Sequence, residues 1–323
     1  MSQPIDVSIV VPAYNESENI VDTVNRLTAT FTPRPENWQV IFVNDGSTDD
    51  TWAVAQRLAQ ENPRVIAAGY AHNVGRGRAL RHGFNRATGR FIVATDADLS
   101  YDPKYILDLL DTLYQDPETD FVLGSPYMPG GDTEGVDPKR LFISKLGNVV
   151  LRYFVNKDIY TWTGVFRAYR REVLDAIDLE ADDKTLHLEI ISRALAAGYK
   201  VKEVPAVLAS RKKGSSKFRF RGTAVSHLIF SFYERPIWIF GSLGFSMLCL
   251  GTFIGFYLTY LYTQSTLNAN RPLFTLMLLL IIGGVQILSF GFIALQIGIL
   301  RREIIKVQRE TRLLTRHLDN SNK

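Results

Sequence analysis

The sequence predicts an α/β protein, in which a domain built on a mainly parallel sheet is followed by a hairpin of two membrane-spanning helices. From residue 5 to about residue 125, short β-branched runs alternate with helical patterns. This alternation is typical of a parallel sheet that is covered by helices on both faces. The chain then has no charged residue at positions 237–270 or 272–300. Each of these stretches exceeds the roughly 20 apolar residues that cross a bilayer.

Five runs are expected to form the strands: residues 7–11, 40–43, 65–69, 91–95 and 121–124. The composition supports a folded protein, because 46% of the 323 residues are hydrophobic and 22% are charged, which excludes a disordered chain. Ligands of a parallel sheet bind beyond the carboxyl ends of its strands. The residues that follow each strand are therefore the first candidates for a functional site.

The two membrane-spanning helices are expected at about residues 237–262 and 273–300. The alternative is a pair of buried core helices, but charge-free runs of this length are rare in soluble domains. We therefore divide the chain into four parts. These are a cytoplasmic domain (1–215), an amphipathic interfacial segment (216–236), a transmembrane hairpin (237–300) and a basic cytoplasmic tail (301–323).

The distribution of basic residues predicts the orientation in the membrane. The loop between the two spans has Arg271 as its one charged residue, whereas six basic residues follow the second span: Arg301, Arg302, Lys306, Arg309, Arg312 and Arg316. Short segments rich in Lys and Arg stay in the cytoplasm, so both termini are expected there. The first residues lack the basic and apolar regions of a signal peptide. The single cysteine, Cys249, requires no oxidising compartment.

Asp96 and Asp98 form an Asp-x-Asp pair directly after the fourth expected strand. Two carboxylates so close together repel each other, and a hard divalent cation with oxygen ligands relieves that repulsion. The pair therefore predicts a site for Mg²⁺ or Mn²⁺. An ion placed there would bridge a diphosphate and neutralise the charge that grows on a phosphate leaving group.

Several short motifs together resemble the family 2 glycosyltransferases with a GT-A fold, which use a nucleotide-sugar donor. The four motifs in the first hundred residues are VVPAYNE (10–16), VNDGST (43–48), HNVGRG (72–77) and TDADLS (95–100). Three later motifs resemble the branch that loads a sugar onto a polyisoprenyl phosphate: GVFRAY (164–169), EVP (203–205) and RKKGSSK (211–217). The resemblance covers about residues 5–220 and implies a GT-A domain.

The resemblance also implies roles for individual residues. The residues implied to bind the nucleotide sugar are Pro12, Ala13, Tyr14, Glu16, Asn44, Asp45, Gly75, Arg78 and Asp96. Asp98 is the implied metal ligand, together with Asp96. Two positions depart from the family pattern, since Asn44 stands where Asp is frequent and Ser100 where this branch often has Gln. The shorter side chain of Ser100 leaves open whether a third side chain binds the metal.

The densest basic run before the expected spans is found at residues 202–221, with seven Lys or Arg residues and one acid. Such a run is attracted to anionic lipid headgroups. The turn at residues 214–216 adds backbone N–H groups and hydroxyls that suit a phosphate, so we expect Arg211, Ser216 and Lys217 to bind the acceptor phosphate. Aromatic and basic residues then alternate over 218–233, which fits a helix in the plane of the membrane interface.

The expected reaction is an inverting displacement, in which an acceptor phosphate oxygen attacks the anomeric carbon of the donor. The metal and basic side chains, with Arg211 among them, are expected to stabilise the departing nucleoside diphosphate. A phosphate monoester has its second pKa near 6 and is mostly ionised at pH 7, so a general base is optional. Asp158, ahead of the GVFRAY motif, is a candidate for that base.

Other functions remain open at this point. A processive polysaccharide synthase is disfavoured, because none of the four tryptophans follows an arginine as the Gln-x-x-Arg-Trp motif of that branch requires. A non-catalytic membrane scaffold with the same fold and a transferase for another lipid acceptor stay as alternatives. The expected partners are the nucleotide sugar, the polyisoprenyl phosphate, the bilayer and a possible second copy, with no nucleic acid. The sequence leaves open the sugar, the base and the prenol.

Overall fold

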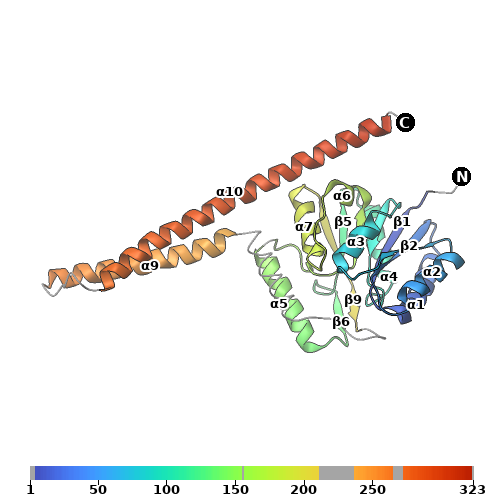
Figure 1. Ribbon diagram of the computed structural model, residues 1–323, viewed down its shortest axis with the longest axis horizontal. Helices are drawn as coiled ribbons and strands as arrows, with labels where there is room; N and C mark the ends of the chain where they lie inside the picture. Colours follow the sequence, from blue (N-terminus) through green and yellow to red (C-terminus); the bar gives the residue numbers. More distant parts are fainter. Residues whose placement is uncertain (1–3, 155, 211–235, 265–271, 322–323) are drawn as a thin grey trace. The chain divides into compact units, whose positions relative to one another are not determined.

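A seven-stranded sheet forms the centre of the N-terminal part of the chain in the computed structural model, which describes residues 4–154, 156–210, 236–264 and 272–321 (Figure 1). The strand order is β3-β2-β1-β4-β7-β5-β8. The strands are β1 (Val7–Ala13), β2 (Trp38–Asp45), β3 (Val65–Tyr70), β4 (Phe91–Ala94), β5 (Phe121–Ser125), β7 (Arg167–Arg170) and β8 (Val201–Pro205). Only β7 runs antiparallel to its neighbours, which confirms the mainly parallel sheet.

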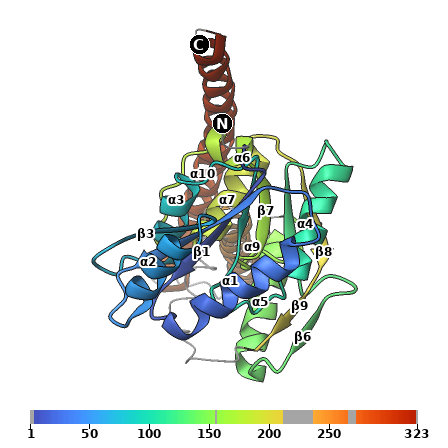
Figure 2. The same cartoon turned by 90° about the vertical axis from the view of Figure 1, so that its right-hand side faces the viewer.

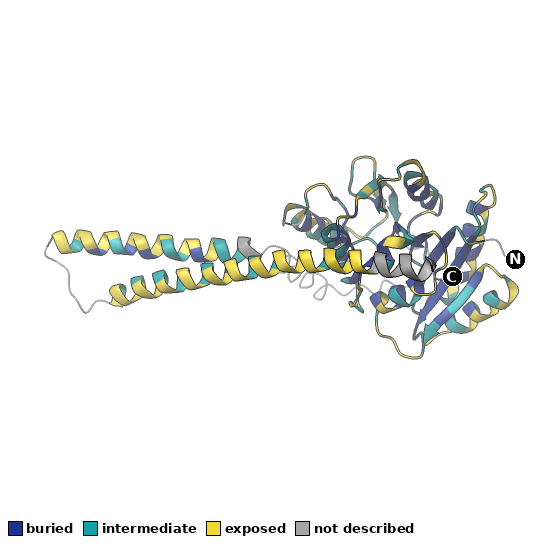
Figure 3. Ribbon diagram, turned by 90° about the horizontal axis from the view of Figure 1, so that it is seen from above, coloured by how far each residue is buried: buried dark blue, intermediate teal, exposed yellow. Residues whose placement is uncertain are grey.

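Helices cover both faces of this sheet (Figure 2). The helices are α1 (Ser17–Phe31), α2 (Thr51–Glu61), α3 (Arg76–Phe84), α4 (Lys104–Gln115), α6 (Arg171–Ala176) and α7 (Leu186–Ala196). Apolar side chains of α1, α2 and α4 form one buried cluster with alternate residues of β1, β2 and β4. On the opposite face α3 lies against the sheet, where Gly83 leaves room for Val10 and Val43. Figure 3 shows deeply buried strands at the centre of this unit, and β1, β2, β4 and β5 are almost wholly buried.

The parallel strands bring the predicted site residues to one edge of the sheet. In the register of β1 with β2, Ala13 lies opposite Asn44, and in that of β1 with β4, Val10 lies opposite Ala94. Because β4 and β5 both run antiparallel to β7, they are parallel to each other. The residues after β5 therefore lie at the same edge as Asp96.

A two-stranded sheet and one further helix extend this edge. β6 (Asp132–Glu134) pairs in parallel with β9 (Val207–Ala209), and α5 spans Pro138–Phe154. The strand β9 is tied to the main sheet, since the N–H of Ala206 donates to the carbonyl of Ser125 and the N–H of Ala209 donates to that of Ser100. The segment after Asp98 and the segment after β5 are therefore both joined to the stretch of chain at residues 206–209.

A second compact unit, residues 228–304, contains α9 (Pro236–Thr263) and the first part of α10 (Pro272–Ser321). Two stretches are long and apolar enough to span a membrane, Ile239–Thr263 with a mean hydropathy of 1.8 and Pro272–Gln308 with 2.4. The two helices approach closely at glycines, because a Cβ added to Gly244 would lie 2.9 Å from the carbonyl oxygen of Gly284. Small residues permit such contact between membrane helices. These helices agree with the two expected spans.

The chain after the second span continues as helix α10 to Ser321 without a break. The expected interfacial segment, residues 216–236, lies outside the described residues except for its last residue.

Candidate active site

The loops that follow β1 and β2 are joined by hydrogen bonds. Asn15, with a φ of 54°, donates its backbone N–H to the hydroxyl of Ser47 over 3.0 Å, and its side-chain oxygen accepts the N–H of Thr48 over 2.8 Å. The carboxylate of Asp49 accepts hydrogen bonds from Ser17 and Thr51, the first residues of α1 and α2. Burial raises the pKa of Asp49, but these hydrogen bonds outweigh burial and leave it below its ordinary value. The edge that carries Pro12, Ala13 and Tyr14 is thereby rigid.

Asp45, at the end of β2, organises the next loop. Its buried carboxylate accepts hydrogen bonds from the Tyr70 hydroxyl over 2.8 Å, the Asn73 side chain over 2.9 Å, and the N–H groups of Val74 and Gly75 over 3.0 and 3.1 Å. Burial, reinforced by the bond to Asp45, raises the pKa of Tyr70. Asp45 therefore holds the turn that starts α3.

The other implied nucleotide residues at this edge are held by local contacts. Glu16 is buried and accepts the side-chain amide of Asn19 over 2.7 Å. The side-chain oxygen of Asn44 accepts the N–H of Ser47 over 3.1 Å, which closes the turn after β2. The structure thus brings Pro12, Ala13, Tyr14, Glu16, Asn44 and Asp45 together at the carboxyl ends of β1 and β2.

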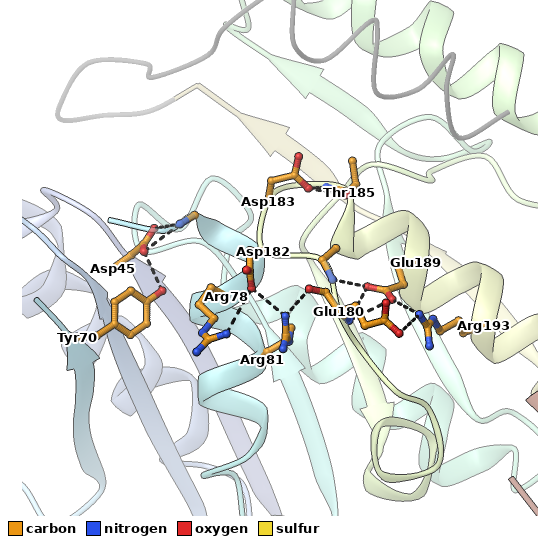
Figure 4. Close-up of polar contacts among 12 residues, drawn as sticks. Asp45, Tyr70, Arg78, Arg81, Glu180, Asp182, Asp183, Thr185, Glu189 and Arg193 are labelled. Carbon is orange, nitrogen blue, oxygen red and sulfur yellow. Dashed lines mark hydrogen bonds and ion pairs between the residues drawn. The ribbon is translucent and has the colours of Figure 1, made fainter. Parts of the chain in front are cut away.

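The start of α3 packs against the loop between α6 and α7 (Figure 4). Gly75 and Gly77 leave no room for side chains there, since an added Cβ would lie 2.5 Å from the carbonyl oxygen of Asp182 and 2.3 Å from that of Asp183, respectively. Arg81 donates to the carboxylate of Asp182 over 2.8 Å, and Arg78 lies 3.8 Å from the same carboxylate. Arg78, which was expected at the nucleotide, therefore pairs with this loop.

Arg76, the first residue of α3, forms an ion pair with Asp96. Its Nη2 lies 3.2 Å from Oδ1 of Asp96, and the two side chains are 42% and 19% exposed. Arg76 stands in the HNVGRG motif, but no pattern in the sequence predicts that it pairs with Asp96. The N-terminus of α3 and the Arg76 guanidinium both attract negative charge, and here they lie beside the Asp96 carboxylate.

Asp98 is oriented by its own loop. Its Oδ1 accepts the Ser100 hydroxyl over 2.6 Å and the Ser100 N–H over 3.0 Å. Leu99 between them has a φ of 46°, and the Thr23 hydroxyl donates to the carbonyl of Ala97 over 2.6 Å. Ser100 thus fixes the side chain of Asp98.

The donor set of Asp96 and Asp98 fits a substrate-bridging divalent ion. Within residues 4–154, 156–210, 236–264 and 272–321, no group of three or more His, Cys, Asp or Glu side chains could enclose a metal. Mg²⁺ commonly keeps several waters and binds through one or two carboxylates and substrate phosphates. The two carboxylates therefore suit an ion that arrives with a diphosphate.

Glu203 fixes the segment before the GVFRAY motif. Its carboxylate accepts the N–H groups of Tyr160 and Thr161 over 2.7 and 2.8 Å, and the Thr161 hydroxyl lies 2.6 Å from that of Ser125. Burial raises the pKa of Glu203, while the two N–H groups act in the opposite direction. Glu203 therefore joins β8, the end of β5 and the Tyr160 segment.

Beneath this wall, Arg167 is a buried cation. Its guanidinium donates to the carbonyl oxygens of Trp162 and His187 over 2.6 and 2.7 Å. The pKa of His187 is held well below its usual value by burial, with Arg167 and Arg76 adding to the effect. Its Nε2 is buried without a hydrogen-bond partner among the described residues. Burial and the neighbouring cations thus disfavour the charged form of His187.

Asp158 lines a hollow that includes neither Asp96 nor Asp98. Its side chain is exposed and lines a surface hollow with Asp116, Lys200 and Lys202. Asp116 precedes β5, and Lys200 and Lys202 lie at the start of β8. These are the amino ends of strands whose carboxyl ends share an edge with Asp96. The role of Asp158 as a general base stays a prediction.

A second hollow, with a volume of about 390 Å³, lies between α5 and the segment after β5. Lys145 and Arg152 of α5 line it, together with Tyr127, Met128 and Tyr160. The guanidinium of Arg152 stacks on the ring of Tyr160 at 3.8 Å. The lining of this hollow thus combines two cations, Lys145 and Arg152, with one carboxylate, Asp132, and with apolar groups. The expected acceptor residues Arg211, Ser216 and Lys217 lie outside the described residues.

Comparison with known proteins gives a consistent picture. The model of glycosyl transferase family 2 matches residues 8–178. Polyprenol monophosphomannose synthase of Mycolicibacterium smegmatis is 35% identical over 216 residues, which cover 65% of this chain and 79% of the relative. Dolichol-phosphate mannosyltransferase of Pyrococcus furiosus is 32% identical, with 66% of this chain and 59% of the relative covered. Glycosyltransferase AglD of Haloferax volcanii is 33% identical, with 62% and 32% covered.

Solved structures share the fold. Glucosyl-3-phosphoglycerate synthase of Mycobacterium tuberculosis, crystallised with Mn²⁺, uridine diphosphate and phosphoglyceric acid, has a TM-score of 0.53 and 17% identity, with 70% of this chain and 78% of that chain covered. The same enzyme with Mg²⁺ and uridine diphosphate has a TM-score of 0.52, 17% identity and coverage of 70% and 79%. At this identity the likeness establishes the architecture of the α/β unit.

Proposed function

The chain belongs to glycosyl transferase family 2, and from this premise we propose that it transfers a hexose from a nucleotide sugar to a polyisoprenyl phosphate in the bilayer. The observation that carries the proposal is the corner formed by Asp96, Asp98 and Arg76 at the carboxyl end of β4, in a chain that also has two candidate membrane spans. The relatives named for mannosyl transfer to polyprenol and dolichol phosphates support the acceptor class.

The donor nucleotide is proposed to bind along the edge formed by Pro12, Ala13, Tyr14, Glu16 and Asn44. Asp45 and Gly75 act there by holding the loop that starts α3, because the Asp45 carboxylate already accepts hydrogen bonds from that loop. Asp96 and Asp98 would hold a Mg²⁺ or Mn²⁺ ion, which would supply positive charge to the diphosphate. The metal complexes of the structural neighbour, crystallised with uridine diphosphate, are consistent with this donor set.

The proposed chemistry is a single displacement. An oxygen of the acceptor phosphate forms a bond to the anomeric carbon, while the bond from that carbon to the β-phosphate oxygen breaks and the nucleoside diphosphate leaves with the electron pair. Arg76 lies where it can stabilise charge on the leaving group. The acceptor phosphate is mostly ionised at pH 7, so no side chain has to remove a proton.

The acceptor is proposed to reach the donor from the membrane. Arg211, Ser216 and Lys217 remain the proposed phosphate ligands, and Lys145 and Arg152 add positive charge at the hollow beside α5. The excess of basic residues after the second span supports a cytoplasmic location of both termini.

Transfer assays with the full chain in lipid vesicles test this function. UDP- and GDP-hexoses would be offered with undecaprenyl or dolichyl phosphate, with and without EDTA. We expect a lipid-linked sugar with one donor, lost with EDTA and in Asp98→Ala. Val21→Ala, an exposed position on α1, serves as the control variant. No transfer from any donor in the presence of Mg²⁺ or Mn²⁺ would overturn the proposal, and transfer to a non-phosphorylated lipid would reassign the acceptor.

A further inference from the structure

The N-terminal turn of α3, which carries Arg76, is held by a distant segment of the chain, the loop at residues 177–185 between α6 and α7. The N-cap residue of α3 is Gly75, which has no side chain to accept hydrogen bonds from the first turn. The backbone N–H of Arg78 instead donates to the carbonyl oxygen of Asp182 over 3.0 Å. Since the first N–H groups of a helix have no partner within the helix, the 177–185 loop supplies an acceptor that the local sequence lacks.

The side chain of Asp182 adds charge to this backbone contact. Its Oδ1 lies 2.8 Å from Nη1 of Arg81 and 3.8 Å from Nη1 of Arg78 (Figure 4). A carboxylate near the N-terminus of a helix also interacts favourably with the helix dipole. The approach is close because Gly75, with a φ of 134°, has no Cβ, which would lie 2.5 Å from the Asp182 carbonyl oxygen. Asp182 therefore holds α3 with both its carbonyl and its carboxylate.

The 177–185 loop is itself fixed to α7. Glu189, in the first turn of that helix, accepts the N–H groups of Glu180 and Ala181 over 3.1 and 2.9 Å. Its carboxylate also lies 2.8 Å from the guanidinium of Arg193, and these two side chains are only 13% and 14% exposed. Arg193 lies 3.0 Å from Glu180 as well. A largely buried ion pair thus anchors the loop that reaches α3.

Arg76 lies between two anchors of the α3 backbone. The carboxylate of Asp45 accepts the N–H of Gly75, the residue before Arg76, over 3.1 Å. The carbonyl of Asp182 accepts the N–H of Arg78, two residues after Arg76. A long side chain that starts from a fixed backbone loses less conformational entropy when it pairs with one partner. The two anchors therefore favour the single location in which Arg76 meets the acidic end of β4.

We propose that Asp182 is a positioning residue for sugar transfer, which acts by holding Arg76 beside Asp96 at the donor diphosphate. This inference rests on the proposed function, in which Arg76 stabilises charge on the leaving group. The contacts of the Asp182 carboxylate are made with α3, so its effect is exerted through Arg76. Rates are sensitive to such placement, because a displacement of about 1 Å at a reacting group can cost about 10²-fold.

A double-mutant cycle in the transfer assay tests this role. Asp182→Ala removes the carboxylate from α3, and kcat at saturating donor and acceptor should fall by about 10- to 100-fold. The same change in an Arg76→Gln background should alter kcat by no more than about twofold, because the residue through which Asp182 acts is then absent. Asp182→Glu keeps the charge and should recover part of the rate. Glu61→Ala removes an exposed carboxylate 4.0 Å from Arg57 and is the matched control, with full activity expected.

Hydrogen–deuterium exchange of the full chain in detergent measures the contact without donor or acceptor. The amides at residues 76–79 should exchange faster in Asp182→Ala than in the wild type or in Glu61→Ala. Arg81→Ala removes the same ion pair from the side of α3 and should behave like Asp182→Ala. A variant that does not fold therefore leaves the other to decide.

Three results would overturn the proposal. An unchanged kcat in Asp182→Ala, or an equal fall in both backgrounds, would make the rate independent of any action of Asp182 through Arg76. Unchanged exchange at residues 76–79 would show that the Asp182 side chain does not hold α3. Each of these results can be obtained while the wild type transfers sugar, so the proposed function would stand. Absence of transfer by the wild type would instead overturn the proposed function, and with it the role of Asp182 in transfer.

Discussion

Ser100 donates both its hydroxyl and its backbone N–H to the same oxygen of Asp98, over 2.6 and 3.0 Å. Two donors on one oxygen hold the carboxylate in a single orientation before any ligand arrives. In metal sites, such supporting contacts often matter almost as much as the ligands themselves. Ser100, which stands where this branch often has Gln, therefore contacts Asp98 directly.

The first prediction concerns this pair. Ser100→Ala removes the shorter hydrogen bond and should raise the Mg²⁺ or Mn²⁺ concentration for half-maximal transfer by about 10- to 100-fold, with a smaller change in the maximal rate at saturating metal. Ser100→Thr keeps the hydroxyl and should recover most of the affinity. A metal titration of transfer activity measures both. Equal metal dependence in wild type and Ser100→Ala would show that the contact has no role.

The second prediction concerns Arg76. Arg76→Gln removes the cation 3.2 Å from Asp96, and because charge develops on the departing diphosphate, kcat should fall by about 10²-fold with unchanged thermal stability. Arg57→Gln is the matched control, since Arg57 is an exposed arginine 4.0 Å from Glu61 on α2, and it should retain full activity. Steady-state kinetics with saturating donor and acceptor provide the test. Loss of activity in both variants would speak against a local role of Arg76.

Residues whose location depends on local sequence could be predicted, whereas residues whose partners are distant in the chain could not. Asp96 and Asp98 follow a strand whose β-branched pattern is local, so their location at the sheet edge follows from the parallel topology. Arg76 could not be assigned from sequence, because its partner lies 20 positions further along the chain. The central strand β7 begins at the buried Arg167. A charged residue is not expected in a buried strand, and Arg167 is accommodated there because its guanidinium donates to two carbonyl oxygens.

Two further features depend on contacts between distant segments. The nucleotide role of Asp45 stays a prediction, and the hydrogen bonds that its carboxylate accepts from Asn73 and Val74, 28 and 29 residues later, could be found only from the structure. The sequence of α5 does not show which side of the helix faces outward. Apolar residues occur both on the side of the buried Leu151 and Asn148 and on the exposed side. Only the packing distinguishes the two sides.

The third prediction tests the structural role of Asp45. Asp45→Asn replaces one acceptor oxygen by an N–H₂ group that faces N–H donors, so unfolding should become easier by about 3 kcal/mol, since buried donors left unpaired cost about 1–3 kcal/mol each. Tyr70→Phe removes one donor from the same carboxylate and should cost about 1 kcal/mol. Denaturant unfolding of the full chain in detergent, followed by circular dichroism, measures the difference. A larger loss in Tyr70→Phe than in Asp45→Asn would contradict this ranking.

The fourth prediction concerns pH and Glu203, whose pKa is raised by burial despite the two N–H groups that it accepts. The folded protein keeps the Glu203 proton to a higher pH than the unfolded chain does. Between the two pKa values the folded state binds more protons, so this group's contribution to stability falls as the pH rises from about 4.5 through the raised value.

The Glu203→Gln variant isolates that contribution, because its side chain does not titrate. Denaturant unfolding of both chains between pH 4 and pH 7 gives the wild-type stability minus the variant stability at each pH. This difference should decrease with rising pH. A difference that increases would mean that the hydrogen bonds from Tyr160 and Thr161 outweigh burial and that the pKa is lowered.

The last prediction concerns the contact between the two apolar helices. An added Cβ on Gly284 would lie 3.0 Å from the carbonyl oxygen of Gly244 and 2.9 Å from Cγ of Leu248, so Gly284→Val should force the helices apart and cost about 1–3 kcal/mol. Gly298→Val on the same helix is the matched control, because an added Cβ there meets nothing within 4 Å. Thermal unfolding of both variants in the same detergent provides the measurement. Equal melting temperatures would mean that the close glycine contact does not stabilise the hairpin, whereas a lower melting temperature for Gly284→Val alone would assign that stability to the contact.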